Sequence, residues 1–418
     1  MMDSKYRAAL AEFYHDQLFN RILPFWTTHG MDEEYGGYFT CFSNTGDQRV
    51  STDKYVWSQG RFIWLFAKLA ELKESSHYLD QAKKGVDFLR AHCFLEDGRC
   101  AFLLSQNGTP KEPEPGKGYD YSIYADCFVV LGFAKYAAVS GDSAVLDAAL
   151  QLYDSIVGRI ERDDFQTYPE PTPKGYKCHG IPMIMLNVSQ ELGQALAGFD
   201  HPRTAEIEQR CSAFSDEVMT EFGQGDLLFE LINRTDHTEQ SLLTRFINPG
   251  HNIENMWFVM HHALKTNDIA TIDQAVAIVA KMFELGWDSE YGGLYHFVDR
   301  EGGRPRGSIN RPSANALIKK IENGWDDKLW WVHSEALYTT LLGYHLTGDR
   351  RMIEAYQKVH DYSFATFPNP NARIGEWIQI RDRYGKPQEK VVALPVKDPF
   401  HITRNFILMI ELLRNMEQ

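Results

Sequence analysis

Apolar residues recur with the 3.6-residue period of an α-helix along most of the 418-residue chain. Each long periodic segment is predicted to form one helix. The expected starts are Ser4, Tyr55, Tyr78, Ser122, Asp142, Ile181, Pro202, Gly250, Asp268, Lys328, Asp349 and Pro399. The pattern therefore predicts about twelve helices, which follow one another as six consecutive pairs.

Three of the helix pairs share one kind of short turn. The turns read VSGDSAVLDAA at 139–149, KTNDIATIDQA at 265–275 and LTGDRRMIEAY at 346–356. In each of them a Gly or Asn ends one helix, because these residues tolerate the left-handed conformation, and an Asp caps the free N–H groups of the next. The turns therefore predict antiparallel helix hairpins.

Longer stretches rich in aromatic and β-branched residues around Gly or Asp lie between the pairs, at 33–42, 96–104, 223–232, 289–298 and 374–387. We interpret them as short β-hairpins or ordered loops at one end of the molecule. This arrangement predicts an all-α fold, an (α/α)6 barrel, with a linear helical solenoid as the alternative. No linker-like or low-complexity stretch interrupts the sequence, so residues 1–418 are expected to form a single catalytic barrel domain.

In such a barrel one helix of each pair lines the inside, and the starts of these inner helices open onto the same mouth. The expected inner starts are mostly apolar and aromatic, yet each carries polar groups that a core helix would not favour. A buried charge costs several kcal/mol unless it is paired or solvated, so this repetition indicates a lined cavity. The polar residues are Arg61, Asp126, Asn187, His251, Glu254, His333, Glu335, His401 and Arg404.

Two of these starts have the same polar spacing. His251 and Glu254 are three residues apart and so share one helix face, which Trp257 continues, and His401 and Arg404 repeat the interval. A single such pair is typical of a solvated helix start, but two at equivalent positions favour a functional site. A metal site is the alternative for these residue types, but no HExxH, HxH or cysteine pair supports it, and none is predicted.

The composition narrows the class of ligand. A net charge of -14 argues against a nucleic-acid or anionic-membrane surface, and we expect a small-molecule partner. Neither of the nucleotide-binding motifs GxGxxG and GxxxxGK[ST] occurs, so no cofactor is expected. A nucleotide effector stays open. The sequence also leaves open whether the protein forms a homodimer. The start of the chain is charged, the six cysteines are scattered, and no long uninterrupted apolar run occurs, which predicts a cytoplasmic protein.

Five ordered motifs carry a resemblance to a known family. KYVWSQGR, NPGHNIE, LWWVHSEA, GEW and FHITR resemble the N-acylglucosamine 2-epimerase family, which is related to the cellobiose 2-epimerases and mannose isomerases. The resemblance covers nearly the whole chain. It implies an (α/α)6 barrel and proton transfer at the carbon next to a sugar carbonyl.

The resemblance also implies roles for individual residues. His251 and His401 match the two catalytic histidines of the family and would exchange the C2 proton on opposite faces of an enediolate. Arg61 would stabilise the charge on that intermediate, and Glu254 would orient His251. The three tryptophans would stack on the sugar, and His333 would assist ring opening. The expected substrate-binding residues are Asn187, Asp126, Trp257, Trp330, Trp331, His333, Glu335 and Arg404.

Several alternatives stay open at this point. Two pairs of substrates stay open: N-acetylglucosamine with N-acetylmannosamine, and mannose with glucose. The stretch VVALPVKDPF at 391–400, just before the last histidine motif, lacks the Gly-rich segment of the acylglucosamine members, so a pocket for the acyl group is not assured. An aldose-ketose isomerase would use the same enediolate and return the proton to C1. A glycoside hydrolase would instead use two carboxyl groups, taken from Asp126, Glu254, Glu335 and Glu376. A binding protein without catalysis would need no pair of histidines.

Overall fold

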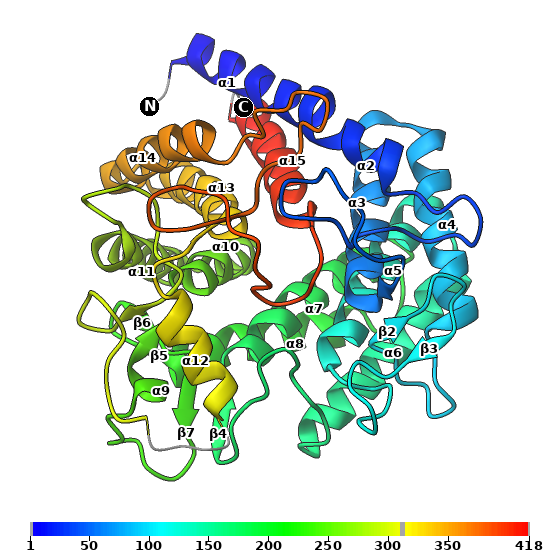
Figure 1. The fold of residues 1–418 in the computed structure, drawn as a ribbon, viewed down its shortest axis with the longest axis horizontal. Helices are drawn as coiled ribbons and strands as arrows, with labels where there is room; N and C mark the ends of the chain where they lie inside the picture. The colour runs from blue at the N-terminus through cyan, green and yellow to red at the C-terminus, as the bar shows by residue number, and fades with distance from the viewer. Residues whose placement is uncertain (1–2, 310–313, 417–418) are drawn as a thin grey trace.

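The computed structural model describes residues 3–309 and 314–416. In this part of the chain six helices form a ring and six others pack around it (Figure 1). The ring helices are α3 (Val56–Lys73), α5 (Ile123–Ser140), α7 (Gly180–Gly198), α10 (Pro249–Thr266), α13 (Trp330–Thr347) and α15 (Phe400–Asn415). The outer helices are α4 (Ser76–His92), α6 (Ser143–Glu161), α8 (Thr204–Glu217), α11 (Ile269–Gly286), α14 (Arg350–Thr366) and α1 (Ser4–Asp16).

The ring is closed. Each ring helix packs against the next, and α15 packs against α3, so the last ring helix meets the first. Each outer helix packs mainly on one ring helix, with α1 on α15. Closure confirms the predicted (α/α)6 barrel and excludes the linear solenoid.

The predicted helix starts are confirmed to within two residues, the largest differences being at α4, α8 and α13. The predicted turn chemistry is confirmed as well. Gly141, Asn267 and Gly348 end their helices with positive φ angles of 76°, 56° and 70°. The aspartates that follow them accept hydrogen bonds from backbone N–H groups in the first turns of α6, α11 and α14.

The sequence pattern missed several shorter elements. They are the π-helical turns η1 (Gln17–Ile22) and η2 (Val218–Phe222), and the helices α2 (Leu23–His29), α9 (Leu242–Arg245) and α12 (Asn315–Gly324). The strands are short and pair antiparallel: β1 (Lys54–Tyr55), β2 (Leu103–Leu104) and β3 (Pro110–Lys111) in one sheet, then β4 (Tyr176–Cys178) with β7 (Leu231–Asn233), β5 (Gly223–Gln224) with β6 (Leu227–Leu228), β8 (Phe246–Ile247) with β9 (Val298–Asp299), and β10 (Lys328–Leu329) with β11 (Ile380–Arg381).

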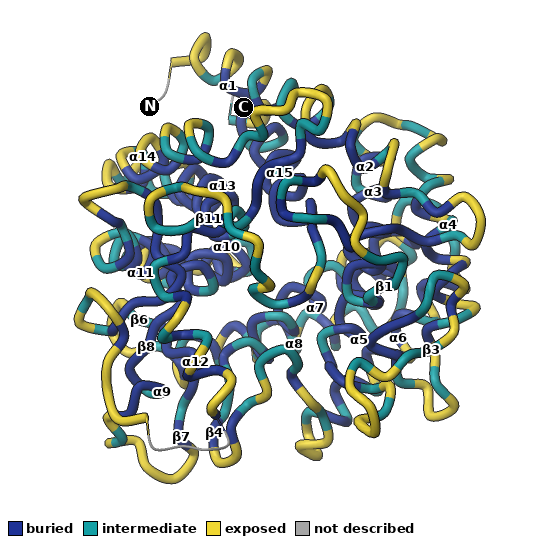
Figure 2. Tube along the Cα trace, viewed as in Figure 1, coloured by how far each residue is buried: buried dark blue, intermediate teal, exposed yellow. Residues whose placement is uncertain are grey.

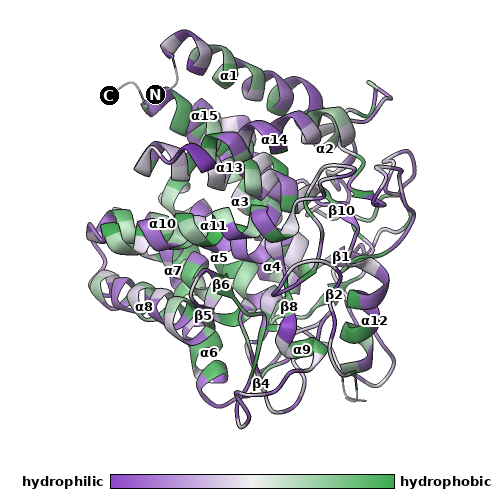
Figure 3. Ribbon diagram, turned by 90° about the vertical axis from the view of Figure 1, so that its left-hand side faces the viewer, coloured by the Kyte–Doolittle hydropathy of each residue, from purple (hydrophilic) through white to green (hydrophobic). Residues whose placement is uncertain are grey.

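Strands β1, β4, β8 and β10 come just before ring helices α3, α7, α10 and α13. The strand pairs therefore fix the starts of these helices at one end of the barrel. Figure 3 shows β1, β2, β10 and α12 together at this end, on the right of the view. We call this end the mouth.

The ring helices are buried on nearly all sides, whereas the outer helices and turns carry the exposed residues (Figure 2). Two glycines allow α3 and α5 to cross closely. A Cβ atom on Gly60 would lie 2.2 Å from the backbone oxygen of Phe128, and one on Gly132 would lie 2.4 Å from that of Gly60. A larger side chain at either position would force the two helices apart.

Helix α5 has the length and apolar composition of a membrane span, but 78% of that segment is buried inside the protein. It lies between α3 and α7 in the ring. These are the properties of a core helix in a soluble protein, and the cytoplasmic location remains a prediction.

Candidate active site

The first turns of the ring helices line a cavity of about 250 Å³ at the mouth. Loop residues at 167–173 and 392–398 complete its walls. Eight of the predicted site residues face this cavity, and they come from five ring helices: Arg61, Asn187, His251, Glu254, Trp330, Trp331, His401 and Arg404.

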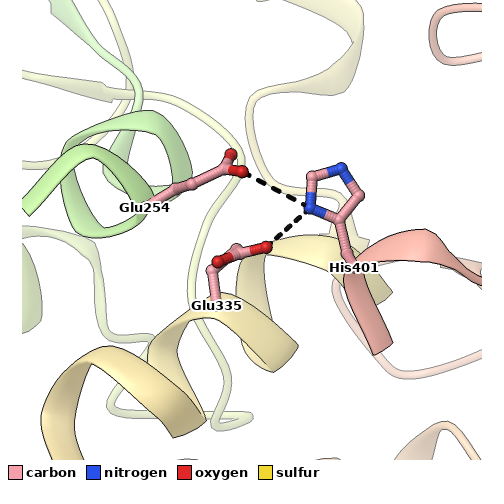
Figure 4. A group of neighbouring side chains, drawn as sticks. All are labelled: Glu254, Glu335 and His401. Atoms are coloured by element: carbon pink, nitrogen blue, oxygen red, sulfur yellow. Dashed lines mark hydrogen bonds and ion pairs between the residues drawn. The ribbon is translucent and has the colours of Figure 1, made fainter. Parts of the chain in front are cut away.

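His401 is held by two carboxylates. Its Nδ1 lies 2.7 Å from Glu335 Oε1 and 3.7 Å from Glu254 Oε1 (Figure 4). Burial alone would raise the pKa of Glu335, but the charge of Arg404 and the bond to His401 lower it to about 2. Because an ionised carboxylate only accepts, Nδ1 of His401 donates in this hydrogen bond, and Nε2 is the other ring nitrogen. Figure 4 shows Nε2 on the side of the ring away from the carboxylates.

Arg404 lies beside the same carboxylates. Its Nη2 donates to Glu254 Oε1 at 2.5 Å and to Glu335 Oε1 at 2.6 Å. Donor atoms of Glu254, Glu335 and His401 lie within 4.8 Å of one another, a set that a metal ion could use, but here the guanidinium supplies positive charge. Two carboxylates and one guanidinium leave this cluster with one net negative charge.

His251 has a different carboxylate partner. Its Nδ1 lies 2.8 Å from Glu230 Oε2, in the loop that leads into β7. Burial by itself would lower the pKa of His251, but the charge and hydrogen bond of Glu230 outweigh this effect and raise it. The other oxygen of Glu230 lies 3.5 Å from His179 Nδ1, and Asn255 donates to His179 Nε2 at 2.6 Å. Glu230 therefore belongs to a buried chain of polar groups.

One indole lies next to both histidines. The ring of Trp331 is centred 5.4 Å from that of His251 and 5.7 Å from that of His401. The two imidazoles, one on α10 and one on α15, are thus brought to a single region of the cavity. Each has one nitrogen bound to a buried carboxylate.

A second cation lines the cavity. Arg61 donates to Asp398 Oδ2 at 2.9 Å, and its guanidinium lies over the ring of Phe128 at 4.1 Å. Both contacts hold the cation in one position, which suits stabilisation of a negative charge that develops during a reaction.

Known proteins resemble this chain over most of its length. The family model described as N-acylglucosamine 2-epimerase (GlcNAc 2-epimerase) matches residues 37–404. The N-acylglucosamine 2-epimerase of Bos taurus is 31% identical over 95% of this chain and 90% of its own length, and that of Homo sapiens is 30% identical over 95% and 88%.

The chain belongs to the N-acylglucosamine 2-epimerase family. It is a carbohydrate 2-epimerase, and therefore an isomerase. Among solved structures, the cellobiose 2-epimerase of Spirochaeta thermophila superposes with a TM-score of 0.77 at 19% identity, covering 99% of both chains. A D-mannose isomerase superposes with a TM-score of 0.75 at 16% identity, covering 96% of this chain and 97% of that one. These two likenesses bear on the fold alone.

The carboxylate pairing in this epimerase differs from the prediction. Glu254 was expected to orient His251, but the hydrogen bond to His251 comes from Glu230, and Glu254 binds Arg404. The prediction rested on the three-residue spacing of His251 and Glu254. That spacing places both side chains on one helix face, but it does not determine which neighbouring element each side chain contacts. Trp257 was expected to stack on the sugar, but it lies outside this cavity and donates to Glu335 Oε2 at 2.8 Å.

Three further predicted residues lie outside the cavity of the epimerase: His333, Asp126 and Glu335. His333 is fully buried, accepts from the Leu294 N–H at 2.9 Å through Nε2, and has its Nδ1 2.7 Å from the Leu329 oxygen. Asp126 is fully buried beside Arg159, with 3.2 Å between Oδ1 and Nη1. Neither side chain is free to reach a sugar. Glu335 also does not line the cavity and acts on it through His401 and Arg404.

Sequence reasoning missed three residues of the site: Glu230, His179 and Asp398. Glu230 is the single charged residue in the otherwise apolar run LLFELI at 227–232, and Asp398 directly precedes the predicted start of the last helix. An isolated charge in an apolar strand segment was a usable signal. His179 had no comparable signal, because it stands in an ordinary polar turn before α7.

Proposed function

We propose that this epimerase interconverts N-acetylglucosamine and N-acetylmannosamine through their open-chain forms, with the whole chain acting as one catalytic domain. The assignment of substrate is supported by the relatives at 30–31% identity, which are N-acylglucosamine 2-epimerases over 95% of this chain. The cellobiose 2-epimerase of Eubacterium cellulosolvens is more distant, at 20% identity. The observation that carries the mechanism is the pair of carboxylate-bound histidines that both lie next to Trp331.

The proposed reaction moves one proton off C2 and one proton back. The C1 carbonyl of the open-chain sugar acidifies the C2 proton only modestly, so a base with a pKa near neutrality is needed. Neutral Nε2 of one histidine takes this proton, and the electrons of the C–H bond form the C1–C2 double bond of an enolate whose negative charge lies on the C1 oxygen. The other histidine, protonated beforehand, returns its proton to the opposite face of C2. The sugar is inverted at C2, and the two imidazoles have exchanged protonation states.

The carboxylates and cations around the histidines serve this exchange. Glu230 and Glu335 fix Nδ1–H of His251 and His401, so that each ring presents Nε2 to the cavity. Both carboxylates also favour the imidazolium that each histidine becomes. Arg61 stabilises the enolate oxygen on C1 more than the uncharged carbonyl from which it forms. Asn187, from α7, is proposed to hold a sugar hydroxyl.

The test is proton NMR in D2O with N-acetylglucosamine, N-acetylmannosamine, mannose, glucose and cellobiose. We expect loss of the C2 proton signal of N-acetylglucosamine together with appearance of its C2 epimer. His251→Asn and His401→Asn should each abolish the exchange, whereas His77→Asn, on the exposed face of α4, should not change it. Full activity in both cavity variants would refute the two-histidine mechanism. A ketose product would assign the protein to the isomerase reaction, and turnover of mannose or cellobiose alone would refute the proposed substrate.

A further inference from the structure

A second cavity, of about 800 Å³, lies at the opposite end of the ring from the mouth. It is lined by later turns of the ring helices α3, α5, α7, α10 and α15, and by residues 208–212 of the outer helix α8. For example, α3 contributes Arg61 to the active site but Lys68 to the second cavity, and α10 contributes His251 to the first but His262 to the second. We call the second cavity the rear chamber. The helix ends around it lie on the left of Figure 3, away from the strands of the mouth.

The rear chamber and the active site share part of one wall. Arg404 and Asn187 line both, and Trp257, which donates to Glu335, lines the rear chamber alone. Neither catalytic histidine lines the rear chamber. The layer around Arg404 therefore separates the two spaces, and the rear chamber has its own opening beside exposed residues such as Gln194 and Gln209.

The charges in the wall of the rear chamber are already paired. Lys68 lies 2.8 Å from Glu411, Lys135 lies 3.2 Å from Glu191, and Lys265 lies 2.6 Å from Glu208. Arg404 is likewise paired with its two carboxylates. An anionic ligand would meet these carboxylates and a cationic ligand would meet the lysines, so the wall favours an uncharged ligand.

The same wall offers hydrogen-bonding groups that are not satisfied within the described residues. Nε1 of Trp64 and Nε of Arg404 are buried donors without a partner, and both side chains pack against Phe400. Buried donors are rarely left unpaired, and both side chains line the rear chamber, so a turn of either side chain would pair its donor with an occupant that accepts hydrogen bonds. The rest of the wall carries side-chain amides and hydroxyls, which both donate and accept: Asn187, Ser189, Gln190, Gln194, Gln209, Ser212 and Thr266.

A glycine on α7 keeps part of this space open. Gly193 lies in the helix interior and lines the rear chamber. A Cβ atom there would meet only Ile207 Cγ2, at an ordinary contact distance of 3.5 Å. Glycine is less favourable than alanine inside a helix, and close packing does not require it at this position. Its effect is to leave volume in the rear chamber.

We propose that the rear chamber binds a neutral polyhydroxylated small molecule, a sugar or a sugar alcohol, at a second site separate from the active site. Hydroxyl oxygens accept from Trp64 and Arg404, hydroxyl hydrogens are donated to the amide oxygens, and the apolar face of the carbon chain packs on the indoles of Trp64 and Trp257. The site does not depend on the epimerase reaction, because it takes no atom from the catalytic histidines.

The test uses D-mannitol, which has no carbonyl group and cannot be epimerised. A crystal structure of the enzyme with D-mannitol locates the bound molecule, and calorimetric titration measures its affinity in solution. Gly193→Leu fills the chamber and should weaken binding at least about tenfold, while Gly193→Ala is the matched control and should change it less than about twofold. Gln209→Leu removes one exposed amide and should weaken binding about threefold to tenfold. Circular dichroism checks that each variant is folded.

Mannitol in the rear chamber, with binding in solution that Gly193→Leu and Gln209→Leu both weaken, would establish the site. Water alone in the chamber, mannitol in the active site only, or binding at crystal concentration only would each overturn the proposal. Unchanged affinity in both Gly193→Leu and Gln209→Leu would overturn it as well. None of these outcomes bears on the epimerase reaction, which the D2O experiment tests through the other cavity.

Discussion

Replacing Glu230 by Gln isolates the charge that acts on His251. The amide oxygen of Gln can still accept the Nδ1–H at the observed 2.8 Å, so the tautomer and the ring position are kept while the negative charge is lost. Burial by itself lowers the pKa of His251, and in this variant the charge of Glu230 no longer counteracts that effect. We therefore expect the pKa of His251 to fall in this variant.

The size of the effect follows from the type of hydrogen bond. A buried bond to a charged group contributes about 1.5–3 kcal/mol and a neutral one about 0.5–1.5 kcal/mol. The difference of about 1–2 kcal/mol corresponds to a loss of roughly fivefold to thirtyfold in kcat/KM. In the direction of the proposed reaction in which His251 is the base, it must be neutral, so a lower pKa also moves the acidic limb of that pH profile to lower pH.

The assay is the pH dependence of kcat/KM for epimerisation, followed by NMR. Glu221→Gln is the matched control, since that carboxylate lies on the surface beside Lys177 and should leave the profile unchanged. A Glu230→Gln enzyme with an unshifted acidic limb would refute the proposed electrostatic role, whether or not the rate falls. A wild-type rate together with a wild-type profile would remove Glu230 from the mechanism.

Three further predictions concern stability. Arg404→Leu leaves two carboxylates buried without their cation, and should lower the free energy of unfolding by about 3–5 kcal/mol in urea titrations; a loss below about 1 kcal/mol would contradict the pairing. Gly60→Ala should lower the free energy of unfolding by at least about 1–3 kcal/mol, because the added Cβ atom meets the backbone of α5. Gly193→Ala should leave the free energy of unfolding unchanged or raise it. Equal changes in the melting temperature of the two variants would contradict the close crossing of α3 and α5. Glu230 and Glu335 have folded pKa values of about 2 against an ordinary 4.5, so their stabilisation is complete above pH 4.5 and is lost as the pH falls toward 2. Acid unfolding followed by circular dichroism should show this window, and the Glu230→Gln variant should have a smaller loss there.

The helix pairs were predictable because two local signals agree. The 3.6-residue period locates each long helix, and the Gly or Asn followed by Asp at residues such as Gly141 and Asp142 fixes the turn between partners. Helix α12 was missed because it is short and packs mainly against a small separate cluster that includes Tyr176 and Phe246. No local pattern reports a contact with residues so distant in sequence.

The site was predicted in its helices but not in its pairings. Ring helices such as α5 and α13 are buried on almost every side, so hydrophobic periodicity does not tell which face meets the cavity. Asp126 and His333 were therefore predicted to line the cavity. In the structure Asp126 faces Arg159, and His333 faces the backbone around Leu294. The partner of His251 comes from a loop twenty-one residues earlier in the chain, a distance that only the tertiary fold determines.

Ring closure by α15 also has a consequence for how the enzyme becomes active during synthesis. This one helix completes the ring between α13 and α3, and it carries His401 and Arg404 into the site. Until it has left the ribosome, Glu335 and Glu254 have neither the imidazole nor the guanidinium that they hold in the finished protein. A nascent chain lacking these residues can pair most of its helices, yet it has only one of the two proposed proton carriers. Catalytic competence and completion of the barrel thus arrive in the same step.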